Sequence, residues 1–366
     1  MDLRMQSPVG PRVVIGGRER DYFSGTGYLG LHSHPEVVQA AVETIGRYGI
    51  ATATSRGGYG EHAVYDQLEA EARRFFGVEK VLYYPSGYLS AAILAQGLRA
   101  RFDAIFIDDA AHYSLWDGAR AVGRPVTGFC HCDPDDLAKK LRAYLTPGAK
   151  PMVLSDGVFP ISGEIAPAPA YREVLAEYEG AWLCLDDAHA TGVLGRNGRG
   201  TLDHYGLQEP NFIAGHTLSK AIGGYGGLIP GPAELLGEVE RASRVTVGAS
   251  PPPLPVAAAA AKALELACDP EIRERLWQNV ARARAGIRAL GWELADTPVP
   301  ILCLCARPGL DLGAIKNRLF ERDICVAHVT GYSSTPAGGA LRIAIFATHT
   351  AEQIDRLVEG LRQVAA

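Results

Sequence analysis

The sequence predicts an α/β protein in which a large domain holds a mostly parallel sheet and a smaller α+β domain follows it. Short runs of β-branched and aromatic residues alternate with helical patterns up to about residue 250, which is typical of a parallel sheet covered by helices. The segment SPPPLP at 250–255 is a rigid break, after which the pattern changes. With 366 residues, 47% of them hydrophobic, the chain can bury a large core.

The strands of the large domain are expected at five apolar runs, which are VLYY (81–84), AIFID (104–108), MVLS (152–155), WLCLD (182–186) and FIAG (212–215). Over 64–76, apolar side chains recur at the spacing of one helix face. An earlier helix is expected to begin at His34-Pro35-Glu36, because proline is favoured in a first helical turn. We therefore expect an N-terminal arm over 1–45 and the large domain over 46–255.

The smaller domain is expected over 256–366. Helical patterns cover 256–267, 271–290 and 311–322, and a last helix begins near Ala351. Strands are expected near 301–305, 325–329 and 341–346. This mixture of helices and strands predicts an α+β domain that a C-terminal helix closes.

Charge and the N-terminal residues argue against several kinds of partner. The 36 Lys and Arg against 41 Asp and Glu leave a net charge of −5, which does not favour binding to nucleic acid or to an anionic membrane surface. The first residues lack the apolar run of a signal peptide, and no window of about 18 uncharged apolar residues suggests a membrane span. The sequence therefore predicts a soluble, cytoplasmic protein.

The seven cysteines predict no metal site. None of them forms a CxxC motif, and the pairs Cys130/Cys132 and Cys303/Cys305 lack a second ligand pair at the spacing of a zinc site. His131 lies between the first two and is the one feature that favours a metal. We interpret the cysteines as reduced, partly buried thiols.

Lys220 is the clearest candidate for chemistry. It ends the sequence Thr217-Leu218-Ser219-Lys220, which follows an expected strand and precedes the glycine-rich stretch 223–227. A lysine at a strand end, beside backbone that can approach a ligand, can lose its proton on desolvation and act as a nucleophile. Considered alone, Lys220 would be interpreted as a solvated surface residue. Whether it has a catalytic role therefore depends on the polar groups expected near it.

Three more polar groups follow other expected strands. Asp186 ends the run WLCLD and is a poor structural residue unless it meets a cation, and His189 comes three residues later. The turn Ser86-Gly87-Tyr88 precedes a helix, so its N–H groups and the positive helix end can bind a phosphate. His112 lies just beyond AIFID. Ligands bind at the carboxyl ends of parallel strands, so we expect these groups to share one site.

Taken in this order, the turn, the histidines, the acidic strand end and the lysine resemble the fold type I family of pyridoxal-phosphate (PLP) enzymes, the aspartate-aminotransferase superfamily. Within it the chain is most similar to the α-oxoamine synthases. The resemblance covers most of the chain and rests on Tyr28-Leu29-Gly30-Leu31, Ser55-Arg56, Asp186-Asp187-Ala188-His189, Thr217-Leu218-Ser219-Lys220 and Ala340-Leu341-Arg342. It implies a seven-stranded, mostly parallel sheet in the large domain.

The resemblance implies four catalytic residues. Lys220 would bind the cofactor aldehyde covalently and later move a proton at the substrate α-carbon. Asp186 would keep the pyridine nitrogen protonated, which makes the ring an electron sink. His112 would stack on the ring face, and His189 would hydrogen-bond its phenolic oxygen.

The resemblance also implies the binding residues. The phosphate contacts would come from Ser86, Gly87, Tyr88 and Thr217. Arg342 would bind the amino-acid carboxylate through a bidentate guanidinium, with a salt bridge on a β-strand as the alternative for this arginine.

In family terms the reaction is a decarboxylative condensation of an amino acid with an acyl thioester, which gives an α-aminoketone in a homodimer with its active site at the subunit interface. The alternative on the same scaffold is an aminotransferase, an aldolase or a lyase, because substrate orientation decides which bond breaks. A non-catalytic partner subunit is disfavoured because Lys220 is present.

Four residues depart from the family pattern. Thr26 stands where an asparagine commonly contacts the substrate carboxylate, and Pro160 replaces a serine that helps to hold the phenolic oxygen. Ala91 replaces a frequent asparagine after the phosphate turn, and Glu61 lies where threonine or tyrosine is common. We therefore expect an unaltered cofactor core with changed substrate surroundings.

Glu61 has two interpretations. It could reach the substrate channel from the neighbouring subunit, where it would select a cationic group or repel the anionic tail of CoA. It could instead be a solvent-facing residue that the dipole at a helix start favours. Because the sequence has no long basic run to hold the phosphates of CoA, an acyl group on a carrier protein stays open as the acyl donor.

Overall fold

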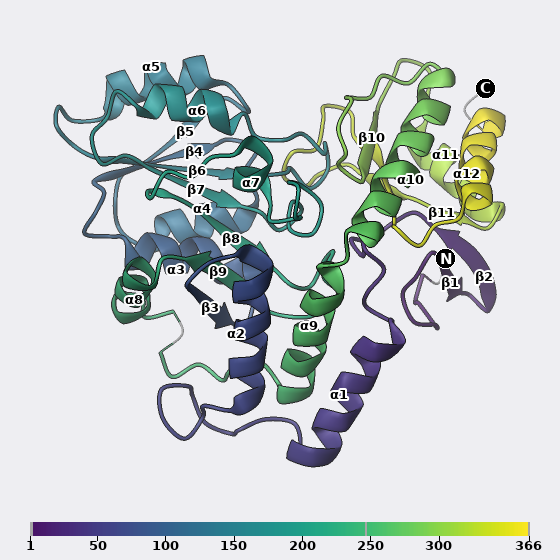
Figure 1. Ribbon diagram of the computed structural model, residues 1–366. Helices are drawn as coiled ribbons and strands as arrows, with labels where there is room; N and C mark the ends of the chain where they lie inside the picture. Colours follow the sequence, from purple (N-terminus) through teal and green to yellow (C-terminus); the bar gives the residue numbers. More distant parts are fainter. Residues whose placement is uncertain (1–2, 246, 365–366) are drawn as a thin grey trace.

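The main sheet of the computed structural model, which describes residues 3–245 and 247–364, has seven strands in the order β3-β9-β8-β7-β6-β4-β5 (Figure 1). They are β3 (Lys80–Tyr84), β4 (Ala104–Asp108), β5 (Val126–Phe129), β6 (Pro151–Asp156), β7 (Trp182–Asp186), β8 (Phe212–Thr217) and β9 (Gly227–Gly231). Only β9 runs antiparallel to its neighbours among these strands. The mostly parallel seven-stranded sheet is confirmed. Each of the five predicted runs is a strand, whereas the glycine-containing β5 and β9 gave too weak an apolar signal to predict.

Helices cover both faces of this sheet, because its central strands are apolar on both sides. In β4, Ile105 and Ile107 pack with α3 (Ser90–Gly97), α4 (Tyr113–Arg120) and α8 (Ala233–Ala242). Phe106, which points to the opposite face, packs with α5 (Pro134–Tyr144) and α6 (Ala168–Leu175). Figure 1 shows these two helical layers on opposite sides of the sheet, with the short α7 (Thr201–Tyr205) beside α6.

The C-terminal part forms a second layer of helices and strands. A three-stranded antiparallel sheet joins β10 (Ile301–Cys305), β13 (Ala340–Ala344) and β12 (Ala327–Val329), and the helices α10 (Pro270–Ala289), α11 (Leu312–Glu321) and α12 (Ala351–Val364) lie beside it. The run predicted at 325–329 divides into β11 (Ile324–Cys325) and β12, which join different sheets. The helix α9 (Leu254–Ala267) packs instead against α1 (Pro35–Tyr48) and α2 (Ala63–Phe76).

The N-terminal segment crosses between the two parts of the molecule. Strands β1 (Arg12–Ile15) and β2 (Arg18–Tyr22) pair with each other, and β2 pairs in parallel with β11. Beyond β2 the chain passes Phe23 and Tyr28, both fully buried, on its way to α1. This path places Tyr28 close to the carboxyl edge of the main sheet. Within the described ranges, we find no helix with the length and apolar content that a membrane crossing needs.

His349 fastens β2 to the small domain and is expected to make the fold sensitive to acid. Its Nδ1 accepts the N–H of Phe346 at 2.9 Å, its Nε2 lies 3.0 Å from the carbonyl of Tyr22, and its ring stacks on Phe23. Burial lowers the pKa of His349 to about 4. Protonation would place a hydrogen on Nδ1, against the N–H of Phe346.

Because the folded pKa lies below the unfolded value of about 6.5, the unfolded state binds more protons as the pH falls, and stability is lost. At about pH 5 this histidine alone should cost roughly 2 kcal/mol relative to neutral pH. We expect His349→Gln to be less stable than wild type at neutral pH but to lose less stability on acidification. Urea unfolding followed by tryptophan fluorescence at both pH values measures this difference, and equal losses in the two proteins would contradict it.

Candidate active site

Four side chains form one continuous chain of hydrogen bonds at the carboxyl edge of the sheet. Lys220, three residues beyond β8, places its Nζ 2.9 Å from Nε2 of His189. Nδ1 of His189 lies 2.7 Å from the hydroxyl of Tyr28, which accepts an N–H from Nη2 of Arg342 at 3.0 Å. The predicted residues Lys220, His189 and Arg342 are thus brought together, and Tyr28 of the N-terminal segment connects them.

The direction of these hydrogen bonds follows from the arginine. A guanidinium can only donate, so Tyr28 accepts a hydrogen bond from Arg342 and its hydroxyl donates one to Nδ1 of His189. Burial and the nearby charges of Lys220 and Arg342 hold the pKa of His189 well below its usual value, so the imidazole is neutral with its hydrogen on Nε2. Burial also lowers the pKa of Lys220, although Asp186 and Asp156 oppose this. This series of hydrogen bonds therefore ends at the amine of Lys220, which can be neutral, and a neutral amine is the form a nucleophile needs.

Arg342 joins three segments that are distant in the sequence. From β13 it donates through Nε to the carbonyl of Pro160 at 2.7 Å and through Nη1 to the carbonyl of Gly25 at 2.9 Å, besides its bond to Tyr28. Arg342 forms no ion pair with another described residue, so these bonds account for the burial of its charge. A guanidinium has five N–H groups, so two remain for a carboxylate.

Asp186 faces a second buried carboxylate. Asp156, the last residue of β6, is its register partner across the parallel ladder, and both side chains are buried. Burial and the charge of Asp186 raise the pKa of Asp156 well above its ordinary value. Neither carboxylate belongs to an ion pair among the described residues, so the pair provides a negative environment suited to a cationic ligand atom.

His112 caps α4 beside this acidic pair. Its backbone N–H donates to Asp156 at 2.7 Å, and its Nδ1 lies 2.7 Å from the hydroxyl of Ser114. Its Nε2 lies 2.7 Å from the hydroxyl of Tyr332, which comes from the loop between β12 and β13. Burial lowers the pKa of His112, which favours the neutral ring that can lie on an aromatic cofactor.

The predicted phosphate turn and Thr217 meet in the structure. Ser86 caps the short helix η1 (Gly87–Leu89), which continues into α3, and its hydroxyl accepts the N–H of Tyr88. A Cβ added at Gly87 would lie 2.7 Å from Cβ of Thr217, so only glycine lets the turn approach the end of β8 this closely. The hydroxyl of Thr217, the N–H groups of the turn and the positive helix end converge there.

These features fit pyridoxal phosphate. The buried acidic pair suits a protonated pyridine nitrogen, the Gly87 turn suits a phosphate, and the buried amine of Lys220 is a group that can bind an aldehyde. His112 and His189 lie on the same edge of the sheet, where a flat ring can contact both.

The residues that depart from the family pattern have local physical explanations. Thr26 lies between Gly25, which binds Arg342, and the buried Gly27, so it borders the predicted carboxylate site. Pro160 offers no side-chain donor, but its carbonyl holds Arg342. Ala91 is small because α4 approaches α3 closely, and a Cβ on Gly118 would lie 2.8 Å from that of Ala91.

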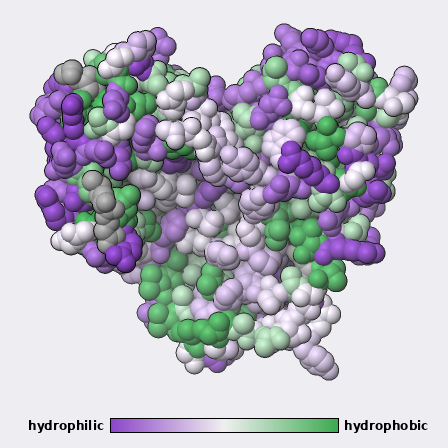
Figure 2. Space-filling model, turned by 180° about the vertical axis from the view of Figure 1, so that it is seen from behind, coloured by the Kyte–Doolittle hydropathy of each residue, from purple (hydrophilic) through white to green (hydrophobic). Residues whose placement is uncertain are grey.

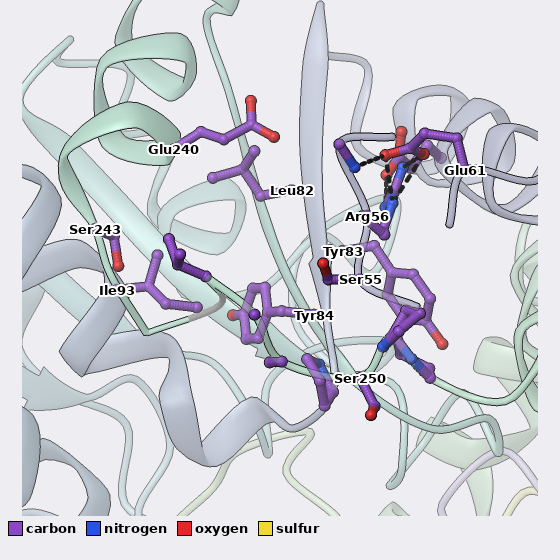
Figure 3. A pocket seen from close by; sticks show the side chains of 18 of the residues that line it. Ser55, Arg56, Glu61, Leu82, Tyr83, Tyr84, Ile93, Glu240, Ser243 and Ser250 are labelled. Atoms are coloured by element: carbon purple, nitrogen blue, oxygen red, sulfur yellow. Dashed lines mark hydrogen bonds and ion pairs between the residues drawn. The ribbon is translucent and has the colours of Figure 1, made fainter. Parts of the chain in front are cut away.

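Glu61 lies beside a separate cavity of about 500 Å³ next to β3. Figure 3 shows Arg56 and Glu61 pointing toward each other on one side of this cavity, joined by a 2.9 Å ion pair. Although burial opposes it, the bonds from Arg56 and the N–H of Gly57 lower the pKa of Glu61, so it carries a charge. Neither Lys220 nor His189 is among the described residues that line the cavity.

Three site residues were not predicted from the sequence. Asp156 could have been found, because it ends an apolar strand run just as Asp186 does. Tyr28 was noticed only as part of a family motif, and nothing in the local sequence indicates its bonds to His189 and Arg342. Tyr332 comes from a loop whose position depends on how the two domains pack.

Comparisons with known proteins agree with this site. The family model for aminotransferase class I and II matches residues 24–361. The 8-amino-7-oxononanoate synthase of Methylococcus capsulatus is 36% identical over 361 residues, which cover 98% of this chain and 92% of that protein. The synthase of Symbiobacterium thermophilum is 33% identical over 362 residues, with 98% and 92% covered.

A solved serine palmitoyltransferase from S. paucimobilis with bound PLP and myriocin superposes with a TM-score of 0.92 at 26% identity, covering 99% of this chain and 92% of that one. These proteins are named as two synthases and a palmitoyltransferase, which does not favour the alternative of an aminotransferase, an aldolase or a lyase. The chain belongs to the aminotransferase class I and II family and, within it, to the α-oxoamine synthases, PLP-dependent acyltransferases of fold type I that condense an amino acid with an acyl thioester.

Proposed function

We propose that this enzyme condenses a small α-amino acid, with alanine as the first candidate, with an acyl thioester through Lys220, His189, His112 and Asp186. The observation that carries the proposal is the unbroken chain from Lys220 through His189 and Tyr28 to Arg342. It joins a group that can bind an aldehyde and move a proton to a cation that can bind a carboxylate. An amino acid needs both at one α-carbon.

Each residue has a task in this proposal. Arg342 binds the amino-acid carboxylate through its two remaining N–H groups and orients the α-carbon. Lys220 removes the α-proton, and His189 keeps the lysine amine in place through its Nε2. Bound PLP supplies the electron sink that stabilises negative charge at the α-carbon.

Alanine comes first because of the product for which the curated relatives are named. In 8-amino-7-oxononanoate, carbons 8 and 9 with the amino group are what remains of alanine after loss of its carboxylate, and carbons 1–7 come from a seven-carbon acyl group. The name serine palmitoyltransferase makes serine and a long-chain acyl group the second pair to test.

The deciding experiment incubates the enzyme with alanine, serine and glycine in turn in D₂O and follows exchange of the α-proton by NMR. The amino acid that exchanges is then mixed with acyl thioesters, and the release of CO₂ is measured. We expect exchange with alanine, and release of CO₂ only when a thioester is present. Release without a thioester, or exchange with none of the three, would contradict the proposal.

As we further propose, Glu61 borders the channel by which the acyl partner reaches the active site of the neighbouring subunit. The cavity beside it has three carboxylates, from Glu61, Glu69 and Glu240, against two cations, from Arg56 and Lys80, so its field opposes an anionic tail.

We expect Glu61→Gln to lower KM for an acyl-CoA by about threefold to tenfold, the size of one partly screened charge contact, with kcat unchanged. Glu359→Gln, on α12 and outside the residues that line the cavity, is the matched control and should not change KM. Unchanged constants in both variants would leave Glu61 without a role in selection.

We also propose that two copies pair through α1. Its side chains Val38, Val42 and Ile45 are 47%, 55% and 44% exposed and form one row at helical spacing. Figure 2, which shows the molecule from behind, has a hydrophobic patch at its lower end, where Figure 1 places α1. Ile50 and Tyr59, in the loop after α1, are exposed as well. Apolar side chains gathered on one face are typical of an interface between subunits.

Val42→Glu should therefore yield a monomer with little activity, because a buried unpaired charge at an interface costs several kcal/mol. Light scattering after gel filtration measures the mass. Gln39→Glu adds the same charge to an exposed polar position of the same helix and should stay a dimer. A wild-type monomer in solution would refute the proposed pairing.

A further inference from the structure

A cluster of three metal-binding side chains lies outside the active site, at the ends of β4 and β5. Asp108 is the last residue of β4, and His131 and Cys132 follow β5. One ligand atom of each residue lies within 4.8 Å of the others. The sequence alone could not show this cluster, because Asp108 is far from the two other residues along the chain.

The carboxylate of Asp108 is fully buried and held in place. Its two oxygens accept the N–H groups of Ala110 at 2.9 Å and of Cys132 at 2.8 Å. Each oxygen accepts one backbone N–H in this way. Because a carboxylate oxygen has two lone pairs, one lone pair on each oxygen remains for another partner. Nδ1 of His131 lies 3.0 Å from one of the oxygens.

The spacing suits zinc. A tetrahedral zinc ion bound by one imidazole nitrogen and one carboxylate oxygen separates these atoms by about 3.3 Å, so an opening of a few tenths of an ångström admits the ion. Together the three residues offer nitrogen, sulfur and oxygen, a donor set that zinc accepts and that magnesium and calcium do not prefer.

Glu164 orients the imidazole from its other side. The Nε2 of His131 lies 3.1 Å from the carboxylate of Glu164, which leaves Nδ1 facing Asp108. Metal-bound histidines usually donate their second ring N–H to such a carboxylate. A cavity of about 460 Å³, lined among others by Cys132, Glu164, His204 and Asp296, gives an ion a path to the cluster.

We propose that Asp108, His131 and Cys132 bind a zinc ion, with Glu164 as the carboxylate that positions His131 and with a fourth position open to the cavity. Without the ion, the contact between Nδ1 of His131 and Asp108 at 3.0 Å holds these two side chains together. The site lies beside two supports of the active site. Asp108 ends the strand that leads to His112, and Glu164 follows Pro160, whose carbonyl holds Arg342.

The test is zinc binding by the purified PLP-loaded enzyme, measured by equilibrium dialysis with zinc alone and elemental analysis. We expect one strongly bound zinc per chain in the wild type, and affinity at least about tenfold weaker in Cys132→Ser and in His131→Gln. Cys130→Ser is the matched control, because this exposed neighbour lies outside the cluster. It should bind zinc as the wild type does.

Two further measurements keep the test decisive if a ligand variant fails to fold. Glu164 is half exposed, so Glu164→Gln should fold, and we expect it to bind zinc about 10- to 100-fold more weakly. X-ray absorption at the zinc edge should show one sulfur at about 2.3 Å and lighter ligands at about 2.0–2.2 Å. No bound zinc in the wild type, no sulfur ligand, or equal affinity in wild type and Glu164→Gln would each overturn the proposal.

Discussion

Replacement of Lys220 by alanine is expected to abolish turnover while PLP still binds without a covalent link. In the proposed function this side chain both binds the cofactor and moves the α-proton, so kcat should fall by about 10⁴- to 10⁶-fold, as it does when one member of a catalytic unit is removed. His189 would lose its partner at 2.9 Å, whereas the bonds of Tyr28 and Arg342 do not depend on the lysine.

The absorption spectrum measures the covalent link. Wild-type enzyme should show an absorption band at about 420 nm from the cofactor linked to the lysine. Reduction with borohydride should attach that cofactor permanently to the polypeptide. In Lys220→Ala the band should shift toward that of free PLP, and mass spectrometry after borohydride should find no adduct. The control is Lys80→Ala, a surface lysine that pairs with Glu240, which should keep the band. A stable adduct in Lys220→Ala would assign the covalent link to another lysine.

Asp186→Asn is expected to reduce kcat by about 10²- to 10³-fold, the range found when one electrostatic contact to a reacting group is lost. Asparagine keeps the shape and can still accept the N–H of Ala188, which Asp186 binds at 2.9 Å. What disappears is the negative charge that would hold a pyridine nitrogen protonated.

The same substitution should make the protein without cofactor more stable, because Asp186 and Asp156 repel each other and neither belongs to an ion pair among the described residues. Thermal unfolding of the cofactor-free protein and single-turnover rates of the loaded enzyme together separate this role from a structural one. Asp156→Asn tests the pair from the other side. It should relieve the same repulsion but lower kcat less, because Asp156 is occupied by the N–H of His112. A loss of stability in Asp186→Asn would show that the residue mainly holds the fold.

Local sequence signals predicted the elements that place the site. Apolar runs gave the strands β4, β7 and β8, and the rule that ligands bind at the carboxyl ends of parallel strands pointed to the residues that follow them. The turn Ser86-Gly87-Tyr88 was predicted from its place before a helix, and in the structure Gly87 of this turn lies against Thr217. These features depend on residues near one another in the chain, so a single sequence can reveal them.

The remaining features depend on contacts between distant segments. Tyr28 reaches His189 only because the N-terminal segment passes between the two domains, and no pattern around it predicts that path. The run at 325–329 divides because its first residue pairs with β2 as part of β11, whereas residues 327–329 pair with β13 as β12. The pairing of Glu61 with Arg56 likewise depends on how the loop before α2 folds.

With Arg342 as the proposed ligand of the amino-acid carboxylate, its three bonds would link amino-acid binding to the arrangement of the domains. The same guanidinium contacts the N-terminal segment at Gly25, the large domain at Pro160 and the buried hydroxyl of Tyr28. A substrate carboxylate that binds it must alter the strength of these contacts. Thermodynamic reciprocity then applies. If amino-acid binding shifts the equilibrium position of one of these segments by some factor, a change that fixes the segment in that position alters the affinity for the amino acid by the same factor. Variation far from the cofactor, in the arm or in the loop at Pro160, is therefore expected to tune how tightly this enzyme binds its amino acid.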